Sequence, residues 1–215
     1  MKRDFSNVRL CVLVADGVSA LPFETLVQEI AAGGANCIQL REKGIPDAII
    51  FERAQLCRRV CDEAGCIFIV NDRPDIAVLS DADGVHVGQT DLPAAAARRI
   101  IGPDAILGVS ATNLCDLAAA ERSGADYVGI GAVFPTATKD IEAKGLGLIE
   151  EAAHIATRPL LAIGGITAAN AAAVIRAGAD GVAVFSAVVS DADPRAATRR
   201  LGMIVDRALA DRNKS

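Results

Sequence analysis

The stretch YVGIGAVFPTATKDIE, from Tyr127 to Glu142, decides the fold of this chain. It begins as an apolar, strand-like run that ends near Ile130. It continues into a polar loop that carries two hydroxyls and one cation, Thr136, Thr138 and Lys139. In α/β barrels, the loops after the carboxyl ends of the parallel strands carry the chemistry. The stretch therefore predicts a reactive loop at the end of a barrel strand, with partners on other strand ends.

Seven other apolar runs alternate with helical stretches along the chain. We expect strands at Leu10–Val14, Cys37–Leu40, Ile67–Val70, Gly84–Val87, Ala105–Val109, Tyr127–Ile130, Leu160–Ile163 and Gly181–Phe185. We expect helices at Pro22–Ala32, Asp47–Ala64, Arg73–Leu79, Pro93–Ile101, Asn113–Ser123, Leu148–Ala156, Ala168–Ala177 and Pro194–Leu209. Continuous apolar runs that alternate with helices are typical of parallel strands buried on both faces. The prediction is an α/β protein, a single (β/α)8 TIM barrel domain over residues 1–215. A doubly wound open sheet is the alternative, but it usually has fewer strands.

A weak internal repeat supports the count of eight strands. A short turn-like segment precedes every even-numbered strand: Gly34-Ala35-Asn36, Asp81-Ala82-Asp83-Gly84, Gly124-Ala125-Asp126 and Gly178-Ala179-Asp180-Gly181. Each segment is typical of a helix that ends at a glycine and turns into a strand. No linker or low-complexity segment interrupts the series.

Composition excludes several classes of function. Hydrophobic residues make up 52% of the chain and aromatic residues only 3%, so the core is expected to consist of aliphatic side chains. The net charge of −5 argues against a general binder of nucleic acid or of membrane surfaces. The N-terminal MKRDFSNVRL runs directly into the first strand, with neither a signal peptide nor a membrane span. A cytoplasmic protein is expected.

Six cysteines lie mostly in apolar runs and form no CxxC pair. We interpret them as buried free thiols in a reducing compartment. Cys57, Cys61 and Cys66 suggest a metal site, but no histidine lies near them and their spacing matches no common zinc pattern.

The end of the second strand, QLREK, carries an amide and two cations. Alternation along an extended segment places Gln39, Arg41 and Lys43 on one side. Two cations and an amide suit a pyrophosphate. A solvated charged turn explains the same residues equally well when they are taken alone.

Two carboxylates follow the third and fourth strands, Asp72 in NDRP and Asp91 in GQTD. Neighbouring strand ends bring them close enough to share Mg²⁺, which takes one or two carboxylates and completes its shell with phosphate oxygens and water. The alternative for each is a helix-capping role. Beside Arg41 and Lys43, the two carboxylates predict a metal–pyrophosphate site.

The later strand ends offer hydroxyls and glycines. Ser110 follows the fifth strand and is either a ligand or a helix cap. Gly164 and Gly165 follow the seventh strand and Ser186 the eighth, which is the usual place of a phosphate site in barrels. His86 lies in the fourth strand and is expected to be a satisfied core histidine. HExxH, GxSxG and Walker-type motifs are missing.

These motifs, taken in order, resemble thiamine-phosphate synthase over nearly the whole chain. The matching segments are QLREK (39–43), NDR (71–73), GVHVGQTDLP (84–93), GVS (108–110), YVGIGAVFPTATK (127–139), IGGI (163–166) and FSA (185–187). The resemblance implies a transferase of thiamine biosynthesis that joins a hydroxymethylpyrimidine diphosphate to a thiazole phosphate and releases pyrophosphate.

The resemblance also implies the roles of individual residues. Mg²⁺ is expected on Asp72 and Asp91, with Arg41, Lys43, Ser110 and Lys139 as catalytic residues. The expected substrate contacts are Gln39, Leu40, Arg41, Glu42, Lys43, Asn71, Ser110, Thr136, Ala137, Thr138, Lys139, Gly165, Phe185 and Ser186. The pyrimidine diphosphate is expected on Gln39, Arg41, Lys43, Asn71, Ser110 and Lys139. The thiazole phosphate is expected on Thr136, Thr138, Gly165, Phe185 and Ser186.

Two segments depart from the family pattern. The first strand ends in Leu13-Val14-Ala15-Asp16 where the family usually reads YLVTD. The loop after Lys139, Asp140 to Gly145, carries more charge than the family usually has.

Three other functions compete with this interpretation. A thiazole tautomerase of the same barrel type needs no complete set of cations and carboxylates. A sugar-phosphate epimerase needs an acid–base pair that we do not find. A non-catalytic carrier or regulator of thiazole phosphate needs no catalytic residues. The expected partners are the two small-molecule substrates, and a homo-oligomer is left open.

Overall fold

The computed structural model describes residues 4–136, 142–212 and 214. Eight parallel strands pair in the order β1 to β8 and close on each other through β8 and β1. The strands are β1 (Leu10–Val14), β2 (Cys37–Leu40), β3 (Ile67–Asn71), β4 (Gly84–Val87), β5 (Ile106–Ala111), β6 (Tyr127–Ile130), β7 (Leu160–Ile163) and β8 (Gly181–Val184). The predicted (β/α)8 barrel is confirmed.

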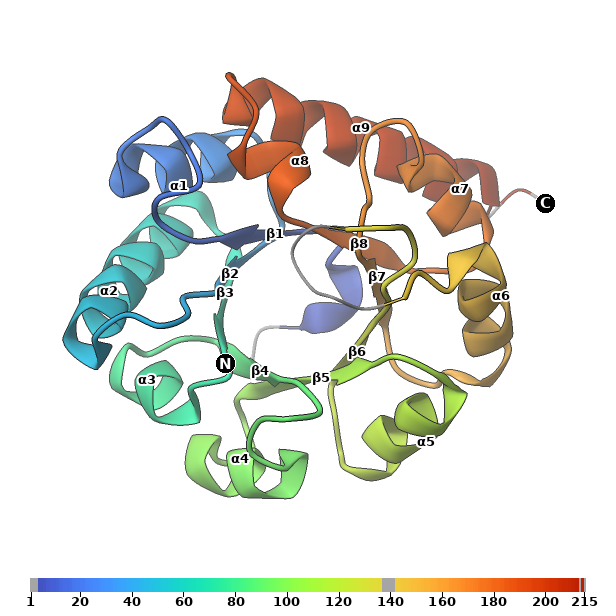
Figure 1. Ribbon diagram of the computed structural model, residues 1–215, viewed down its shortest axis with the longest axis horizontal. Coiled ribbons are helices and arrows are strands. Elements are labelled where there is room, and N and C mark those ends of the chain that lie inside the picture. The colour runs from blue at the N-terminus through green and yellow to red at the C-terminus, as the bar shows by residue number, and fades with distance from the viewer. Residues whose placement is uncertain (1–3, 137–141, 213, 215) are drawn as a thin grey trace.

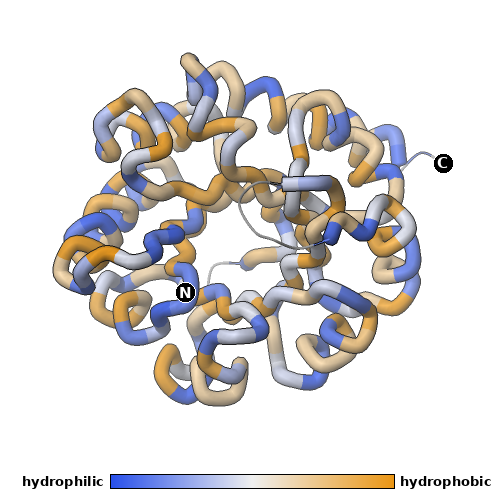
Figure 2. The backbone as a smooth tube through the Cα atoms, in the orientation of Figure 1, coloured by the Kyte–Doolittle hydropathy of each residue, from blue (hydrophilic) through white to orange (hydrophobic). Residues whose placement is uncertain are grey.

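Helices surround the barrel on the outside (Figure 1). They are α1 (Phe23–Ala32), α2 (Asp47–Ala64), α3 (Pro74–Leu79), α4 (Ala94–Ile101), α5 (Leu114–Arg122), α6 (Gly145–Ile155), α7 (Ala171–Arg176), α8 (Ser186–Val189) and α9 (Pro194–Arg212). Figure 2 shows hydrophobic residues along the strands and a mixture of both kinds along the helices, as expected when each helix covers the barrel with one face. Within the described residues, no helix is both long and apolar enough to cross a membrane.

Two short elements were missed by the sequence analysis. The chain does not run directly into β1, because η1 (Phe5–Asn7) forms a single 3₁₀ turn capped by Asp4. A second short helix, α8, follows β8 at once. Neither element is long enough to show a helical period. The helix expected from Ala168 begins only at Ala171, because the side chain of Asn170 accepts the N–H of Thr167 and holds a turn there.

Side chains that point into the barrel form a core separate from the one between strands and helices. Tyr127 is the largest of them and is 2% exposed. Phe5 stacks on its ring with centroids 3.7 Å apart and thereby fills the N-terminal end of the barrel. Gly108, on the neighbouring β5, leaves room for this ring, since a Cβ atom at Gly108 would overlap it. A large residue on one strand is thus matched by glycine on the next.

The predicted repeat corresponds to four equivalent backbone contacts at the N-terminal end of the barrel, which we call the rim contacts. In each, a side-chain oxygen before an even-numbered strand accepts a backbone N–H of the strand before it. The acceptor and donor pairs are Asn36 with Leu10, Asp83 with Phe68, Asp126 with Leu107 and Asp180 with Leu160. In the last three, an arginine from a helix also pairs with the carboxylate: Arg58, Arg98 and Arg212 respectively. The rim contacts fix each odd strand to its successor.

The cysteines are free thiols, as predicted. Five are buried and Cys115 is exposed. Burial raises the pKa of Cys37, which lies beside Cys11 in the barrel interior. No cluster of three or more potential metal-binding His, Cys, Asp or Glu residues occurs in the described part of the chain.

We predict that Asp83→Ala lowers the free energy of unfolding by about 2 to 4 kcal/mol, because Phe68 N–H loses its acceptor and the largely buried Arg58 loses one of its two carboxylate partners. Arg200→Ala is the control. It removes an exposed ion pair with Asp191 and should cost less than about 1 kcal/mol. Urea denaturation measures both. Equal losses for the two variants would contradict a structural role of the rim contacts.

Candidate active site

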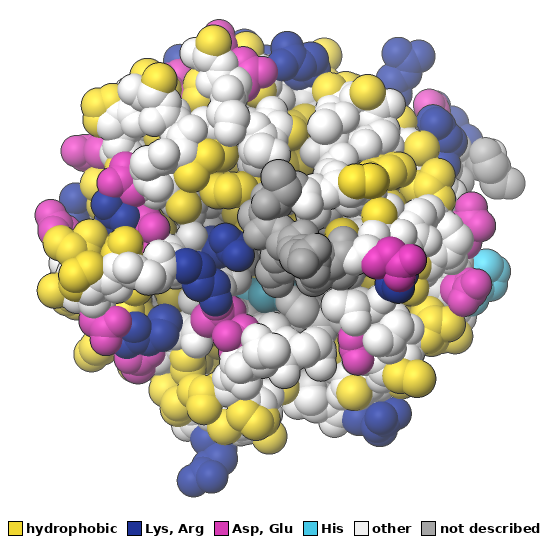
Figure 3. Space-filling model, in the orientation of Figure 1, with side chains coloured by type: hydrophobic (Ala, Val, Ile, Leu, Met, Phe, Trp, Pro, Cys, Tyr) yellow, Lys and Arg dark blue, Asp and Glu magenta, His cyan; other side chains and the backbone are white. Residues whose placement is uncertain are grey.

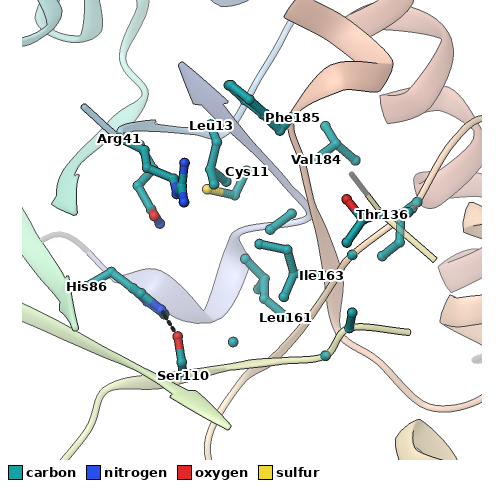
Figure 4. A pocket seen from close by; sticks show the side chains of 18 of the residues that line it. Cys11, Leu13, Arg41, His86, Ser110, Thr136, Leu161, Ile163, Val184 and Phe185 are labelled. Atoms are coloured by element: carbon teal, nitrogen blue, oxygen red, sulfur yellow. Dashed lines mark hydrogen bonds between the residues drawn. The ribbon is translucent and has the colours of Figure 1, made fainter. Parts of the chain in front are cut away.

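A cavity of about 140 Å³ opens at the carboxyl ends of the strands. Figure 4 shows that one side of it carries polar groups, including Arg41, His86 and Ser110, and the other side carries Thr136 and Phe185. Leu161 and Ile163 lie between the two sides, and Cys11 and Leu13 complete an apolar floor. The cavity therefore has two chemically different sides, one more polar than the other.

The end of β2 behaves as its alternation predicts. Gln39 and Arg41 line the cavity, and the backbone N–H of Arg41 continues the pairing with β1 by donating to Val14. Leu40 is 1% exposed in the layer between strands and helices. The Glu42 side chain instead contacts Arg53 on α2. The side chains of Leu40 and Glu42 therefore point away from the cavity, and only their backbone remains available for the predicted substrate contacts.

Lys43, Asp72 and Asp91 come together beside the cavity. The Lys43 ammonium forms an ion pair with Asp72, whose carboxyl is in hydrogen-bond contact with that of Asp91. Asp91 also accepts the N–H of Gly88 at 2.8 Å. Burial and the Asp91 carboxyl raise the pKa of Asp72, while the ammonium of Lys43 opposes the rise. Figure 3 shows basic and acidic side chains next to each other on one side of the central opening.

The capping roles considered for Asp72, Asp91 and Ser110 do not occur in the structure. Helices α3 and α4 have no side-chain cap, and α5 is capped by Asn113. Asp72 has φ = 64°, a left-handed conformation in which aspartate and asparagine are tolerated better than most residues. Its backbone N–H donates to the carbonyl of His86, which ties the end of β3 to β4.

His86 connects two other polar groups of the barrel interior. Its Nδ1 lies 3.0 Å from the hydroxyl of Tyr127 and its Nε2 lies 2.9 Å from the hydroxyl of Ser110. It is a satisfied core histidine, as predicted, but it also lines the cavity. The signal in the sequence was its alternation with Val85 and Val87, which pointed it inward. Gln89 adds a hydrogen bond to the carbonyl of Ser110 at 2.6 Å.

The other side of the cavity is formed by the ends of β6, β7 and β8. Gly165, Thr136, Phe185 and Ser186 all line it, and Asn71 lies across from them. Gly165 has φ = 61°, and a Cβ atom there would lie 2.5 Å from the carbonyl oxygen of Pro135. The glycine therefore allows the loop after β7 to approach the loop after β6. The predicted contacts Ala137, Thr138 and Lys139 lie outside the described residues.

Comparison with known proteins agrees with this arrangement. A family model described as thiamine monophosphate synthase matches residues 10–188. The chain belongs to this family. It is 49% identical to the thiamine-phosphate synthase of Moorella thermoacetica, over 87% of this chain and 90% of that protein. It is 45% identical to that of Chlorobium luteolum, over 94% of both chains.

A solved structure gives the same result. The thiamine phosphate pyrophosphorylase from Pyrococcus furiosus superimposes with a TM-score of 0.88, at 38% identity, over 94% of this chain and 97% of that one. The activity of the chain is that of its family: a transferase of thiamine biosynthesis that forms thiamine phosphate and releases pyrophosphate. The tautomerase, epimerase and carrier readings find no support in these comparisons.

We predict that Gly108→Ala destabilises the fold by about 1 to 3 kcal/mol, because the added methyl overlaps the Tyr127 ring and lies 2.5 Å from Nδ1 of His86. Displacement of His86 should also lower kcat. The control is Gly147→Ala in α6, where a Cβ atom meets nothing within 4 Å and helix propensity favours alanine by up to about 1 kcal/mol. Thermal unfolding and steady-state kinetics test both variants. An unperturbed Gly108→Ala protein would show that the interior accommodates the methyl.

Proposed function

We propose that the polar side of the cavity binds the hydroxymethylpyrimidine diphosphate and that the side formed by β6, β7 and β8 binds the thiazole phosphate. The observation that carries this assignment is the meeting of Lys43 with the Asp72–Asp91 pair, next to Arg41. Cations next to paired carboxylates suit a diphosphate that is bound together with a metal ion. The reaction of a tautomerase has no diphosphate leaving group, so it does not require this combination of cations and carboxylates.

The residues present fit Mg²⁺. The carboxyls of Asp72 and Asp91 are in contact with each other, and the pKa of Asp72 is raised. A cation bound between them would neutralise the charge of both. Mg²⁺ commonly takes only one or two carboxylates and fills its shell with phosphate oxygens and water. Asp72 and Asp91 would hold it, and it would supply neutralising charge to the diphosphate.

The reaction breaks the bond between the CH2 group of the pyrimidine and the diphosphate oxygen. The electron pair of this bond leaves with pyrophosphate, and the aminopyrimidine ring stabilises the positive charge that remains on the CH2 carbon. Arg41 and Lys43 stabilise the growing charge on the leaving group, the kind of interaction that contributes most to catalysis. We assign Lys139 to the same task, as the sequence predicts. The thiazole nitrogen then donates its electron pair to the CH2 carbon and forms the new C–N bond.

The interior residues orient the pyrimidine and limit the access of water. Gln39 is 5% exposed and offers an amide to the ring nitrogens and amino group. Ser110 is held by His86 and can present its hydroxyl to the same ligand, together with Asn71. Leu13, Leu161 and Ile163 surround the reacting carbon with apolar groups, so water competes less with the thiazole. No protein nucleophile is needed in this scheme.

On the opposite side, we place the thiazole phosphate against Thr136, Gly165, Phe185 and Ser186, with Thr138 as a further hydroxyl. Gly165 brings backbone without a side chain to the cavity wall, and the hydroxyls of Thr136 and Ser186 complete a phosphate site. The thiazole ring is then directed toward the apolar floor, where the CH2 carbon lies.

The proposed metal site predicts a stability effect as well as an activity effect. EDTA should abolish coupling of the two substrates and Mg²⁺ should restore it. Mg²⁺ at ten times its dissociation constant should also raise the free energy of unfolding by about 1.4 kcal/mol. Asp72→Asn and Asp91→Asn should lose both responses, and asparagine suits the backbone conformation at position 72. Full activity in the double variant would exclude this site.

The phosphate site predicts a selective effect on one substrate. Gly165→Ala should cost about 1 to 3 kcal/mol of strain and displace the Pro135 carbonyl, which corresponds to roughly 5- to 150-fold weaker thiazole-phosphate binding. Binding of the pyrimidine diphosphate should change little. Gly65→Ala is the control, because it has φ = 71° but no atom within 4 Å, at the end of α2. Calorimetry with each substrate measures both; selective loss of the pyrimidine ligand would mean that the two half-sites are reversed.

A further inference from the structure

Arg53, on α2, makes a set of contacts behind the end of β2. Its Nη1 donates to Oε1 of Glu42 at 2.6 Å, and its Nη2 pairs with the carboxylate of Asp16 in the loop after β1. The guanidinium also lies 5.3 Å from the centre of the Phe23 ring on α1. One arginine thus contacts the segments after β1 and β2 and the first turn of α1.

The contacts converge on Glu42. Its carboxylate accepts the backbone N–H of Asp16 at 3.0 Å in addition to the bond from Arg53. The Glu42 side chain is only 5% exposed and that of Arg53 is 19% exposed, so this is a largely desolvated pair. A desolvated ion pair whose carboxylate also accepts a backbone N–H holds its geometry better than a solvated ion pair on a surface.

Glu42 stands between the two cations of the proposed leaving-group site. Along QLREK, Arg41 lines the cavity and Lys43 contacts Asp72, while Glu42 points the opposite way. Because neighbouring side chains of an extended segment point in opposite directions, fixing Glu42 outward also keeps Arg41 toward the cavity and Lys43 toward Asp72. A shift of about 1 Å in groups of this kind costs up to about 100-fold in rate.

Arg53 also affects the charge of this segment. Without its guanidinium, the Glu42 and Asp16 carboxylates would lose the cationic partner they share, and each would attract the other cations nearby. Arg41 and Lys43 are sequence neighbours of Glu42. The Arg53 guanidinium therefore prevents the Glu42 carboxylate from drawing Arg41 and Lys43 away from the proposed leaving-group site.

We propose that Arg53 is a positioning residue of the transferase, which acts through Glu42 to aim Arg41 and Lys43 at the departing pyrophosphate. The proposal rests on the function proposed above for Arg41 and Lys43. Arg53 itself touches no substrate. Its planar guanidinium reaches two carboxylates at once, which a lysine ammonium cannot reproduce with the same geometry.

The test compares two arginines of the same helix. Arg58 pairs with Asp62 and Asp83 at the other end of α2, with a side chain 12% exposed. Arg53→Gln should lower kcat about 10- to 100-fold, with the KM for thiazole phosphate unchanged. Arg58→Gln should keep kcat within about twofold of the wild-type value, even if it lowers the unfolding temperature as much as Arg53→Gln does. A loss of activity that only follows the loss of stability in both variants would overturn the proposal.

Two further variants separate positioning from a general structural role. Arg53→Lys keeps the positive charge but not the planar guanidinium. It should restore less than half of the decrease in log kcat that Arg53→Gln causes. Full recovery would show that charge alone matters and would overturn the positioning role. If Arg53→Gln does not fold, Asp16→Asn replaces it, because it removes one of the two pairs at a side chain that is 43% exposed. An unchanged kcat in Asp16→Asn would then count against the proposal.

A double-mutant cycle connects Arg53 to the residue through which it acts. If Arg53 positions Lys43, Arg53→Gln should lower kcat much less in a Lys43→Ala background than in the wild type. Additive effects would overturn the proposal and leave the function of Lys43 intact. If Lys43→Ala alone has no effect on pyrophosphate release, the role proposed for Lys43 at the leaving group is wrong. That outcome is independent of Arg53.

Discussion

The limited space inside the barrel governs the rest of the structure. Every second side chain of each strand points toward the axis, and closure of the sheet fixes how much volume these side chains share. Tyr127 and Phe5 fill the N-terminal end, and Gly108 yields the room that the tyrosine ring needs. Toward the C-terminal end the inward residues become polar, from His86 to Ser110 and Asn71. The packed end thus supports the open end, which holds the cavity.

The sequence was sufficient for the barrel because its strands are both short and uniformly apolar. Runs such as Leu10–Val14 and Gly181–Val184 are buried along their whole length, so their pattern is simple. The prediction failed at η1 and α8, which are too short for a helical period. It also misplaced the start of α7, because the turn held by Asn170 depends on a side-chain hydrogen bond that no periodicity reveals.

The candidate site was predicted to a similar extent. Alternation correctly placed Gln39 and Arg41 on the cavity side, and adjacent strand ends brought Asp72 to Asp91, but the outward direction of the Glu42 side chain was not predicted. What the sequence could not supply is the contact between elements far apart in the chain. The link from His86 to Tyr127 and the link from Arg53 to Asp16 each span more than 30 residues, and no local pattern announces them. Such contacts follow from barrel closure and helix packing.

The four rim contacts have a consequence for how the chain reaches its fold. Each joins residues separated by only 15 to 26 positions, so each strand pair can be secured soon after it is formed. The pairing of β1 with β8 is different, since it joins the two ends of the barrel segment, Leu10 with Val182. Loop closure is most costly in entropy for contacts of large sequence separation. The entropic cost of closing the barrel therefore falls mainly on the β1–β8 seam, which has no such short-range contact to support it among the four rim contacts.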